Sequence, residues 1–163
     1  MSTELPRTFK VTTVWLLVAA LLFVGVQWWQ HRNQAMRFQV LGDVVEIRRG
    51  DDGHYHWPGR INGREVDFLV DTGATGTAIS SALARDLHLE SLGGVRSNTA
   101  GGIVNGQVMR ADVVLRGGVS AQGLRVVALP GLGGNPLLGM DVLSKLRWQQ
   151  SDGKLRIELR QIP

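Results

Sequence analysis

The sequence predicts an all-β domain with one short C-terminal helix, preceded by a single transmembrane helix. Glycine supplies 21 of the 163 residues, a share typical of short strands joined by tight turns and not of a helical bundle. Short β-type segments alternate with turn signals through most of the chain. Residues 11–29, by contrast, form one apolar run without a charged side chain. The length suits one modest domain plus an extension.

The composition allows a real core and excludes several classes of protein. Hydrophobic residues make up 44% and charged residues 20% of the chain, which argues against wholesale disorder. The net charge is +4, and its arginines are scattered along the expected strands, so we interpret them as solvated strand faces and expect no nucleic-acid partner. The chain has no cysteine, which excludes disulfides, a thiolate metal site and a cysteine nucleophile.

The apolar run over residues 11–29 has the length that a bilayer core demands of a helix. Arg7 and Lys10 precede it, and Trp28 and Trp29 end it, where indole rings favour the membrane interface. A buried core helix and a cleaved signal peptide are the alternatives. A signal peptide should be shorter and should end in small residues at its cleavage site, so the sequence favours an uncleaved anchor.

The segment after this run, residues 30–45, favours a juxtamembrane linker that grades into the first strand. We therefore place the folded domain at residues 46–163 and an N-terminal tail at residues 1–10. Residues 44–49, "VVEIRR", favour a strand, and the "GDDG" that follows favours a turn.

A β-hairpin is predicted next. Residues 54–61 and 64–70 favour two strands, and Asn62-Gly63 between them is a two-residue hairpin turn. This hairpin delivers the chain to Asp71.

The following segment, "AISSALARDLHL", has a helical or irregular apolar spacing, with Ser80 or Ser81 as a plausible cap. Residues 93–115 favour two strands joined at a glycine-rich bend, and residues 123–130 favour another strand.

The C-terminal part predicts a short helix and a hairpin. Residues 135–146, "NPLLGMDVLSKL", begin apolar and favour a short helix, with Asp141 near its start, where a carboxylate suits the helix dipole. Residues 147–159 favour a final hairpin about Asp152-Gly153.

One short motif carries possible chemistry. The strand "FLV" runs directly into Asp71, Thr72 and Gly73. Alone this tripeptide is a weak signal, because Asp and Gly also form an ordinary turn after a strand. Its context strengthens it: a hairpin strand leads in, the glycine-rich "AGGIVNG" follows, and "LLGMDVL" comes before the last expected helix.

In these three features the chain resembles the retropepsin group of aspartic proteases. It is most similar to the bacterial membrane-anchored branch, whose members carry Asp-Thr-Gly-Ala behind an N-terminal span. The resemblance covers residues 53–159, which is nearly all of the expected domain. It implies a closed β-barrel of the acid-protease fold and an aspartic endopeptidase that cleaves peptide or protein substrates without a cofactor or metal.

The resemblance makes Asp71 the catalytic residue. Two carboxylates held close together resist double ionisation and share one proton, so one can activate water while the other protonates the leaving amine. Thr72 would brace the two aspartates, Gly73 would make room for backbone N–H groups and substrate, and Ala74 would complete the support.

The sequence holds no second Asp-Thr-Gly or Asp-Ser-Gly, and it is too short for two lobes. A working pair of aspartates therefore requires a homodimer, with Asp71 from each chain meeting on a two-fold axis. Membrane anchoring through residues 11–29 would raise the effective concentration of the chains.

The resemblance assigns a flap to four residues, Gly101, Gly102, Ile103 and Val104. A flap must open for substrate and close to exclude water. The alternative for this segment is an ordinary hairpin turn at Asn105-Gly106.

Leu137, Leu138 and Gly139 match the aliphatic-aliphatic-glycine element that packs beneath the catalytic loop of retropepsins; otherwise they would be ordinary core residues. The chain also departs from the retroviral pattern. Retroviral enzymes pair an Asp just after the Asp-Thr-Gly-Ala string with an Arg just after the later glycine. Here these positions hold Thr75 and Met140, so that ion pair is missing and dimer strength cannot be carried over.

The location follows from the resemblance more than from charge. Basic residues after residue 29 lean slightly toward a cytoplasmic domain, but large domains are translocated largely regardless of charge. The anchored relatives lead us to expect a single-pass protein of the bacterial inner membrane with a periplasmic protease domain.

Other candidate sites are weaker. His54 and His56 alternate on an expected strand, but no third ligand is evident beside them, so we expect a surface role and no metal. The serines lack the G-x-S-x-G setting of a serine hydrolase. The alternative to an active protease is a catalytically weak binding or scaffold module of the same fold at the membrane.

Overall fold

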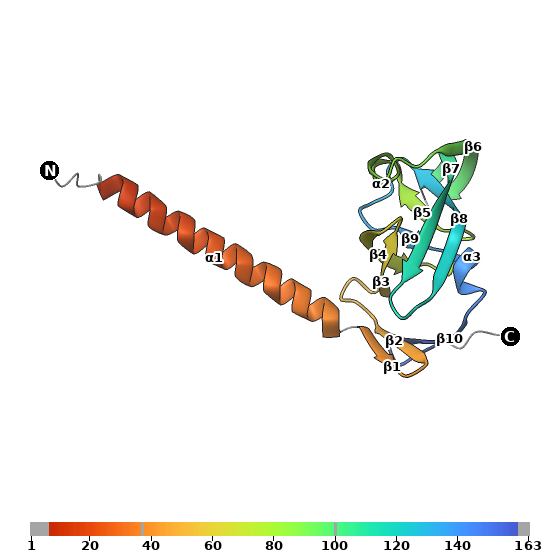
Figure 1. The fold of residues 1–163 in the computed structure, drawn as a ribbon, viewed down its shortest axis with the longest axis horizontal. Coiled ribbons are helices and arrows are strands. Elements are labelled where there is room, and N and C mark those ends of the chain that lie inside the picture. The colour runs from red at the N-terminus through yellow and green to blue at the C-terminus, as the bar shows by residue number, and fades with distance from the viewer. Residues whose placement is uncertain (1–6, 37, 100, 160–163) are drawn as a thin grey trace. The chain divides into compact units, whose positions relative to one another are not determined.

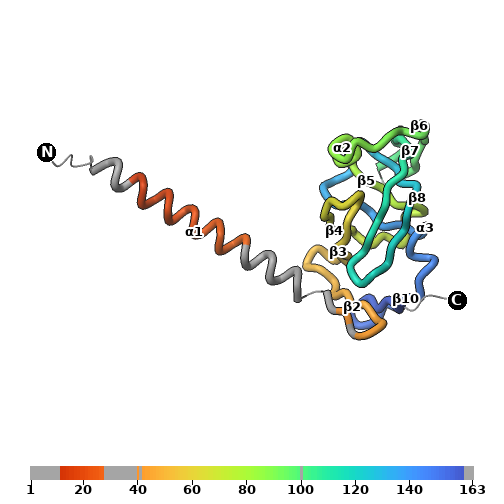
Figure 2. Tube along the Cα trace, in the orientation of Figure 1, coloured from red at the N-terminus to blue at the C-terminus, as the bar shows by residue number. Residues whose placement is uncertain are grey.

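The structure is a computed structural model that describes residues 7–36, 38–99 and 101–159 (Figure 1). It divides into two compact units, Met1–Arg37 and Phe38–Pro163. Figure 2 follows the chain through both units by residue number.

The described part of the first unit is a single helix, α1 (Arg7–Met36). A helix was expected over residues 11–29, but the transmembrane anchor proposed there is not supported. Among the residues that the structure describes, no helix is long and apolar enough to cross a membrane. The expected linker over residues 30–45 contains the end of α1, strand β1 (Phe38–Leu41) and the start of β2 (Val44–Arg48). The inner-membrane location stays a prediction.

The second unit is built around a closed six-stranded barrel, which confirms the expected all-β class. The strands follow in the order β3 (His56–Ile61), β4 (Arg64–Val70), β9 (Leu137–Leu138), β5 (Ala78–Ser80), β8 (Ser120–Leu129) and β7 (Gly102–Leu115), and β7 pairs back onto β3. Strand β6 (Ser91–Thr99) pairs with residues 102–109 of β7 and forms the edge of the sheet. Closure leaves the six barrel strands paired on both sides.

A second, four-stranded antiparallel sheet has the order β1, β2, β11 (Lys154–Glu158) and β10 (Arg147–Ser151). Val45 and Ile157 of this sheet are fully buried and belong to one hydrophobic core with Trp57 and Phe68 of the barrel. Burial of this apolar surface holds the sheet to the barrel. The sequence had predicted its hairpin about Asp152-Gly153 but not the sheet as a separate layer.

The opposite face of this sheet carries a buried carboxylate. Glu46 lies 2.9 Å from Nζ of Lys154 and 3.1 Å from Nε of Arg156. The hydrogen bond from Lys154, supported by the Arg156 guanidinium, lowers the pKa of Glu46 below its ordinary value of 4.5. Because Lys154 and Arg156 stand on β11 and Glu46 on β2, these contacts fix the register of the central strand pair.

Both predicted hairpin turns form. Asn62 (φ 47°) and Gly63 (φ 84°) occupy the left-handed region between β3 and β4, as do Asp152 (φ 51°) and Gly153 (φ 69°) between β10 and β11. Asn and Gly, or Asp and Gly, are the residues that tolerate two successive positive φ angles.

Two short helices complete the unit. Helix α2 (Ser81–Asp86) has Ser80 as its N-cap, whose Oγ accepts a hydrogen bond from the Leu83 N–H at 3.0 Å. This settles the helical-or-irregular alternative in favour of a helix and adds one to the single short helix expected. The expected C-terminal helix is α3 (Met140–Leu143).

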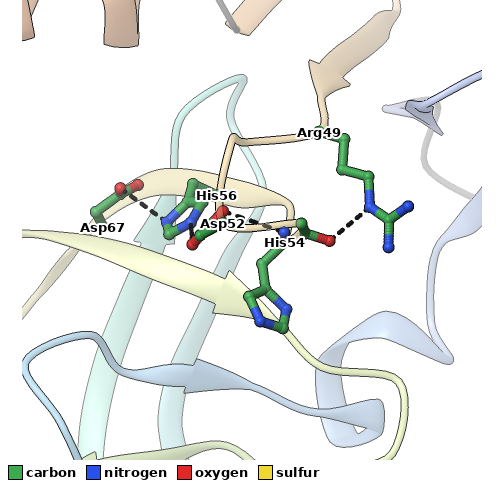
Figure 3. Close-up of polar contacts among 6 residues, drawn as sticks. Arg49, Asp52, His54, His56 and Asp67 are labelled. Carbon is green, nitrogen blue, oxygen red and sulfur yellow. Dashed lines mark hydrogen bonds and ion pairs between the residues drawn. The ribbon is translucent and has the colours of Figure 1, made fainter.

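A polar cluster of Asp52, His56 and Asp67 ties the turn before β3 to β4 (Figure 3). Nε2 of His56 lies 2.7 Å from Oδ2 of Asp52, and Nδ1 lies 3.2 Å from Oδ2 of Asp67. The same turn is closed by backbone bonds, including Gly50 N–H to the His54 carbonyl at 2.7 Å, so β3 begins two residues later than the sequence predicted. His56 is thus held by carboxylates on both sides.

The two carboxyl groups of this cluster are shifted in opposite directions. The hydrogen bond with His56 lowers the pKa of Asp52 from its ordinary value of 3.8, whereas burial raises the pKa of Asp67 above the same value. Asp52 therefore contributes stability that is present above pH 3.8 and is lost as pH falls. Asp67 keeps its proton more readily in the folded state, so its contribution is lost as pH rises through its raised pKa.

We expect Asp52→Asn and Asp67→Asn to change the pH dependence of stability with opposite signs. Relative to wild type, Asp52→Asn should be less stable near neutral pH, by about 0.2–1 kcal/mol for a half-exposed pair, and should approach wild type in acid. The free energy of unfolding of Asp67→Asn, relative to that of wild type, should increase as pH rises. Urea unfolding of the three proteins at about pH 3 and about pH 7 measures this; shifts of the same sign would contradict the assignment.

Candidate active site

Asp71 directly follows β4, beside the short barrel strand β9. Strand β4 pairs in parallel with the short strand β9, with Val70 opposite Leu138. The next N–H, that of Asp71, donates to the Leu138 carbonyl at 3.0 Å. The parallel pairing with β9 therefore sets the position of the Asp71 backbone.

The loop after Asp71 turns tightly over its own carboxylate. The Gly73 N–H donates to Oδ1 of Asp71 at 2.9 Å, and the Ala74 N–H donates to the Asp71 carbonyl at 3.3 Å. A Cβ on residue 73 would lie 3.2 Å from Oδ1, so glycine lets the backbone N–H approach the carboxylate. Asp71 is half-buried and Thr72 and Gly73 are exposed, which leaves the carboxylate within reach of solvent and ligands.

Leu137, Leu138 and Gly139 lie directly against this loop. A Cβ on Gly139 would come within 2.5 Å of the Gly76 carbonyl carbon and 2.6 Å of its oxygen, so any other residue would displace the loop backbone. Leu138 is fully buried. The structure thus brings together the two segments that the sequence had singled out separately, the motif at Asp71 and the aliphatic-aliphatic-glycine element.

Two backbone hydrogen bonds extend this contact past Gly139. The Met140 N–H donates to the Ala74 carbonyl at 2.8 Å, and the Asp141 N–H donates to the Thr75 carbonyl at 3.1 Å. Thr75 and Met140, which replace the retroviral ion pair, therefore meet the opposite segment through their main chains.

Sequence reasoning missed a side-chain pair at the end of the loop, Thr77 with Asp141. The Thr77 hydroxyl donates to Oδ1 of Asp141 and the Thr77 N–H donates to Oδ2, each at 2.9 Å. The sequence had given Asp141 only a helix-dipole role. The two residues are 64 positions apart, so no local pattern joins them.

The segment expected to form a flap is the end of a β-hairpin. Strands β6 and β7 pair from Ser91 to Thr99 on one side, with Thr99 opposite Gly102, so Gly101 lies in the turn. The Thr99 hydroxyl donates to the Gly102 carbonyl at 2.8 Å, and Gly102 has a φ of 106°. Ile103 is 72% exposed, an unusual position for a large apolar side chain.

The alternative turn at Asn105-Gly106 is wrong. Both residues lie inside the ladder, opposite Arg96 and Val95. A Cβ on Gly106 would come within 2.8 Å of the Ala128 carbonyl oxygen, so glycine at this position allows β8 to lie close to the backbone of β7. The function of residues 101–104 as a moving flap stays a prediction.

The Asp71 carboxylate is not hydrogen-bonded to another acidic side chain within the described residues. In the part of the chain that the structure describes, the hydrogen bond to the Asp71 carboxylate comes from Gly73, and no contact joins it to another acidic side chain. Asp141, the acid on the facing segment, is engaged by Thr77.

His54 and His56 do not act together. His56 is enclosed by Asp52 and Asp67, whereas the His54 ring points away from those two carboxylates in Figure 3. Among the described residues, no group of three His, Cys, Asp or Glu side chains is arranged to hold a metal ion.

Comparison with known proteins agrees with this geometry. Residues 57–145, more than half of the chain, match the family described as "gag-polyprotein putative aspartyl protease". A retropepsin-like aspartic protease from Rickettsia conorii is similar in structure, with 20% sequence identity, a TM-score of 0.56, and coverage of 74% of this chain and 93% of that chain. No curated protein matches the chain.

Two further solved structures are similar at lower scores. EIAV protease in complex with the inhibitor HBY-793 is 18% identical, with a TM-score of 0.47 and coverage of 60% of this chain and 92% of that chain. The retroviral protease-like domain of Ddi1 from Leishmania major is 17% identical, with a TM-score of 0.42 and coverage of 58% and 78%.

The matched region begins at the second residue of β3, ends two residues after α3, and contains Asp71, its loop and the Leu137–Gly139 element. At 20% identity, the similarity to the Rickettsia structure shows the fold, whereas the family match shows that the chain is a member of the family. The chain therefore belongs to the gag-polyprotein aspartyl protease family, and its barrel has the retropepsin-like fold.

Proposed function

We propose that this protein is an aspartic endopeptidase that acts as a homodimer, with one Asp71 from each chain in the reacting pair. The observation that carries the proposal is the loop at the end of β4. Its half-exposed Asp71 carboxylate is held by the Gly73 N–H, and the loop rests on Gly139 within a barrel of the aspartyl protease family.

The chemistry follows from two carboxylates and one shared proton. Two such groups a few ångströms apart resist double ionisation, so one is a base and the other an acid at the same pH. The ionised group takes a proton from water, which attacks the peptide carbonyl carbon. The protonated group then supplies a proton to the departing amine nitrogen.

The hydrogen bond from Gly73 serves this arrangement by orienting the Asp71 carboxylate. Since Oδ1 already accepts the Gly73 N–H at 2.9 Å, Oδ2 is the oxygen left to face the partner carboxylate and the water. Thr72 is exposed beside it, and its proposed role is to brace the loop of the second chain. A preorganised carboxylate of this kind needs little rearrangement during the reaction.

The homodimer is supported by what one chain lacks. The sequence contains one Asp-Thr-Gly, and the acid facing its loop, Asp141, is bonded to Thr77. A two-fold axis beside Asp71 would supply the second carboxylate from an identical loop. The β6–β7 hairpin, with the exposed Ile103 near its end, is our proposed cover for an extended peptide over the pair.

Asp71→Asn is expected to lower the rate of peptide cleavage by about 10²–10⁴-fold, because the amide cannot take part in the proton exchange. The assay is cleavage of a peptide library by purified protein, read by mass spectrometry, with unfolding followed in parallel. Asp86→Asn is the matched control, since Asp86 is an exposed acid paired with Arg64 at 3.4 Å. A fold-competent Asp71→Asn protein with wild-type activity would remove Asp71 from the mechanism.

That experiment also separates the protease from the alternative of a binding or scaffold module. A scaffold would show no cleavage in wild type and no difference in Asp71→Asn, while retaining self-association.

Mixing wild type with Asp71→Asn tests the two-chain site. Equal amounts that exchange freely should leave about one quarter of the dimers with two intact Asp71 residues, so activity should fall below the half expected of independent chains. Activity per chain should also drop on dilution. The Asp86→Asn protein, mixed in the same ratio, should leave activity unchanged; a loss proportional only to the wild-type fraction would exclude the shared site.

A further inference from the structure

We propose that Thr77 and Asp141 form the element that positions the Asp71 loop. The kinetic part of this inference rests on the proposed protease function. The structural part, that the pair fixes the loop, does not.

The Asp141 carboxylate joins the two segments of the site with both of its oxygens. Oδ2 accepts the Thr77 N–H at 2.9 Å, and Oδ1 accepts the Thr77 hydroxyl at 2.9 Å and the Val142 N–H at 3.0 Å. A carboxylate that receives three hydrogen bonds from two segments is held in one orientation. It therefore acts as a rigid link between the loop and α3.

Thr77 is the fixed end of this link. Its side chain is fully buried, its hydroxyl also accepts the Gly139 N–H at 3.4 Å, and its carbonyl accepts the Val127 N–H of β8 at 3.0 Å. Without Asp141 the Thr77 hydroxyl and N–H would be buried with no acceptor, which is costly. Thr77 is thus anchored to β8, to residue 139 and to Asp141 together.

The pair holds one of the two ends of the loop that carries Asp71. At the start of the loop, the Asp71 N–H is bonded to the Leu138 carbonyl; at its end, Thr77 is bonded to Asp141. Between these points the Ala74 and Thr75 carbonyls accept N–H groups from Met140 and Asp141. The free span of the loop is therefore short, and its shape depends on both ends.

Neither Thr77 nor Asp141 is bonded to Asp71, so they act through the loop as positioning residues. In a symmetric pair, a displacement of the loop occurs in both chains. Both carboxylates therefore move, and each movement contributes to the change in their separation. Misplacement of a catalytic group by about 1 Å can cost about a hundredfold in rate. The effect should therefore appear in kcat, with little change in KM.

The experiment compares four variants of the full chain. Thr77→Val removes the hydroxyl at nearly constant volume, Thr77→Ser keeps it, and Asp141→Asn removes one of the two acceptor oxygens. Ser80→Ala is the matched control, because it deletes a side-chain hydrogen bond of similar length, 3.0 Å to the Leu83 N–H, at the cap of α2. All four are first checked for cooperative unfolding.

We expect Thr77→Val and Asp141→Asn to lower kcat by about tenfold to a hundredfold with KM within about twofold of wild type. Thr77→Ser should stay within about threefold of wild type, and Ser80→Ala should equal it. Equal losses in kcat for Thr77→Val and Ser80→Ala, or no rescue by Thr77→Ser, would overturn the positioning role. If Thr77→Val does not fold, Asp141→Asn against Ser80→Ala decides the same question.

Amide hydrogen exchange provides a readout that needs no activity. The Gly73 and Ala74 N–H groups are both bonded to Asp71, so their exchange reports the shape of the loop. Exchange at these two amides should be at least about tenfold faster in Thr77→Val than in Ser80→Ala. Unchanged exchange would overturn the inference even in an active enzyme. If wild type cleaves no peptide, the proposed function fails, and exchange alone decides the positioning.

Discussion

The contact between Gly139 and the backbone of Gly76 is the constraint on which the rest of the site depends. These two segments approach so closely that a single Cβ at residue 139 would come within 2.5 Å of the Gly76 carbonyl carbon. Only at this distance can the Met140 and Asp141 N–H groups reach the Ala74 and Thr75 carbonyls. The short parallel strand β9 and the loop after β4 therefore form one unit, and the placement of Asp71 follows from their packing.

The loop after Asp71 is held to the facing segment by hydrogen bonds. The missing ion pair at Thr75 and Met140 is not replaced by another cation and carboxylate. Instead, one carboxylate, Asp141, receives a hydroxyl and two backbone N–H groups, and the backbone of residues 75 and 140 is engaged as well. Hydrogen bonds to a single carboxylate thus hold the loop to the facing segment without a cation.

Local signals predicted most of the fold, and long-range contacts account for what they missed. Asn62-Gly63 and Asp152-Gly153 gave both hairpins because their turn geometry is set by two adjacent residues. The link from Thr77 to Asp141 spans 64 positions, and the cluster at His56 depends on a neighbouring strand, so neither has a local pattern. Asp71 was found through its motif, whereas the reason for its position needed the facing segment. The anchor expected at residues 11–29 rested on an uncharged apolar run with basic and tryptophan residues at its ends, and it is not supported.

The four-stranded sheet has a consequence for how the domain is made. Strand β2 is among the first strands of the domain, yet its partner β11 is the last, and Glu46 meets Arg156 across 110 positions. During synthesis, Val45 and Ile47 have no neighbouring strand on that side until β11 has left the ribosome. We expect a chain in which β11 has not yet formed to keep this apolar edge uncovered, so that pairing of β11 with β2 ends the exposure of the edge to aggregation.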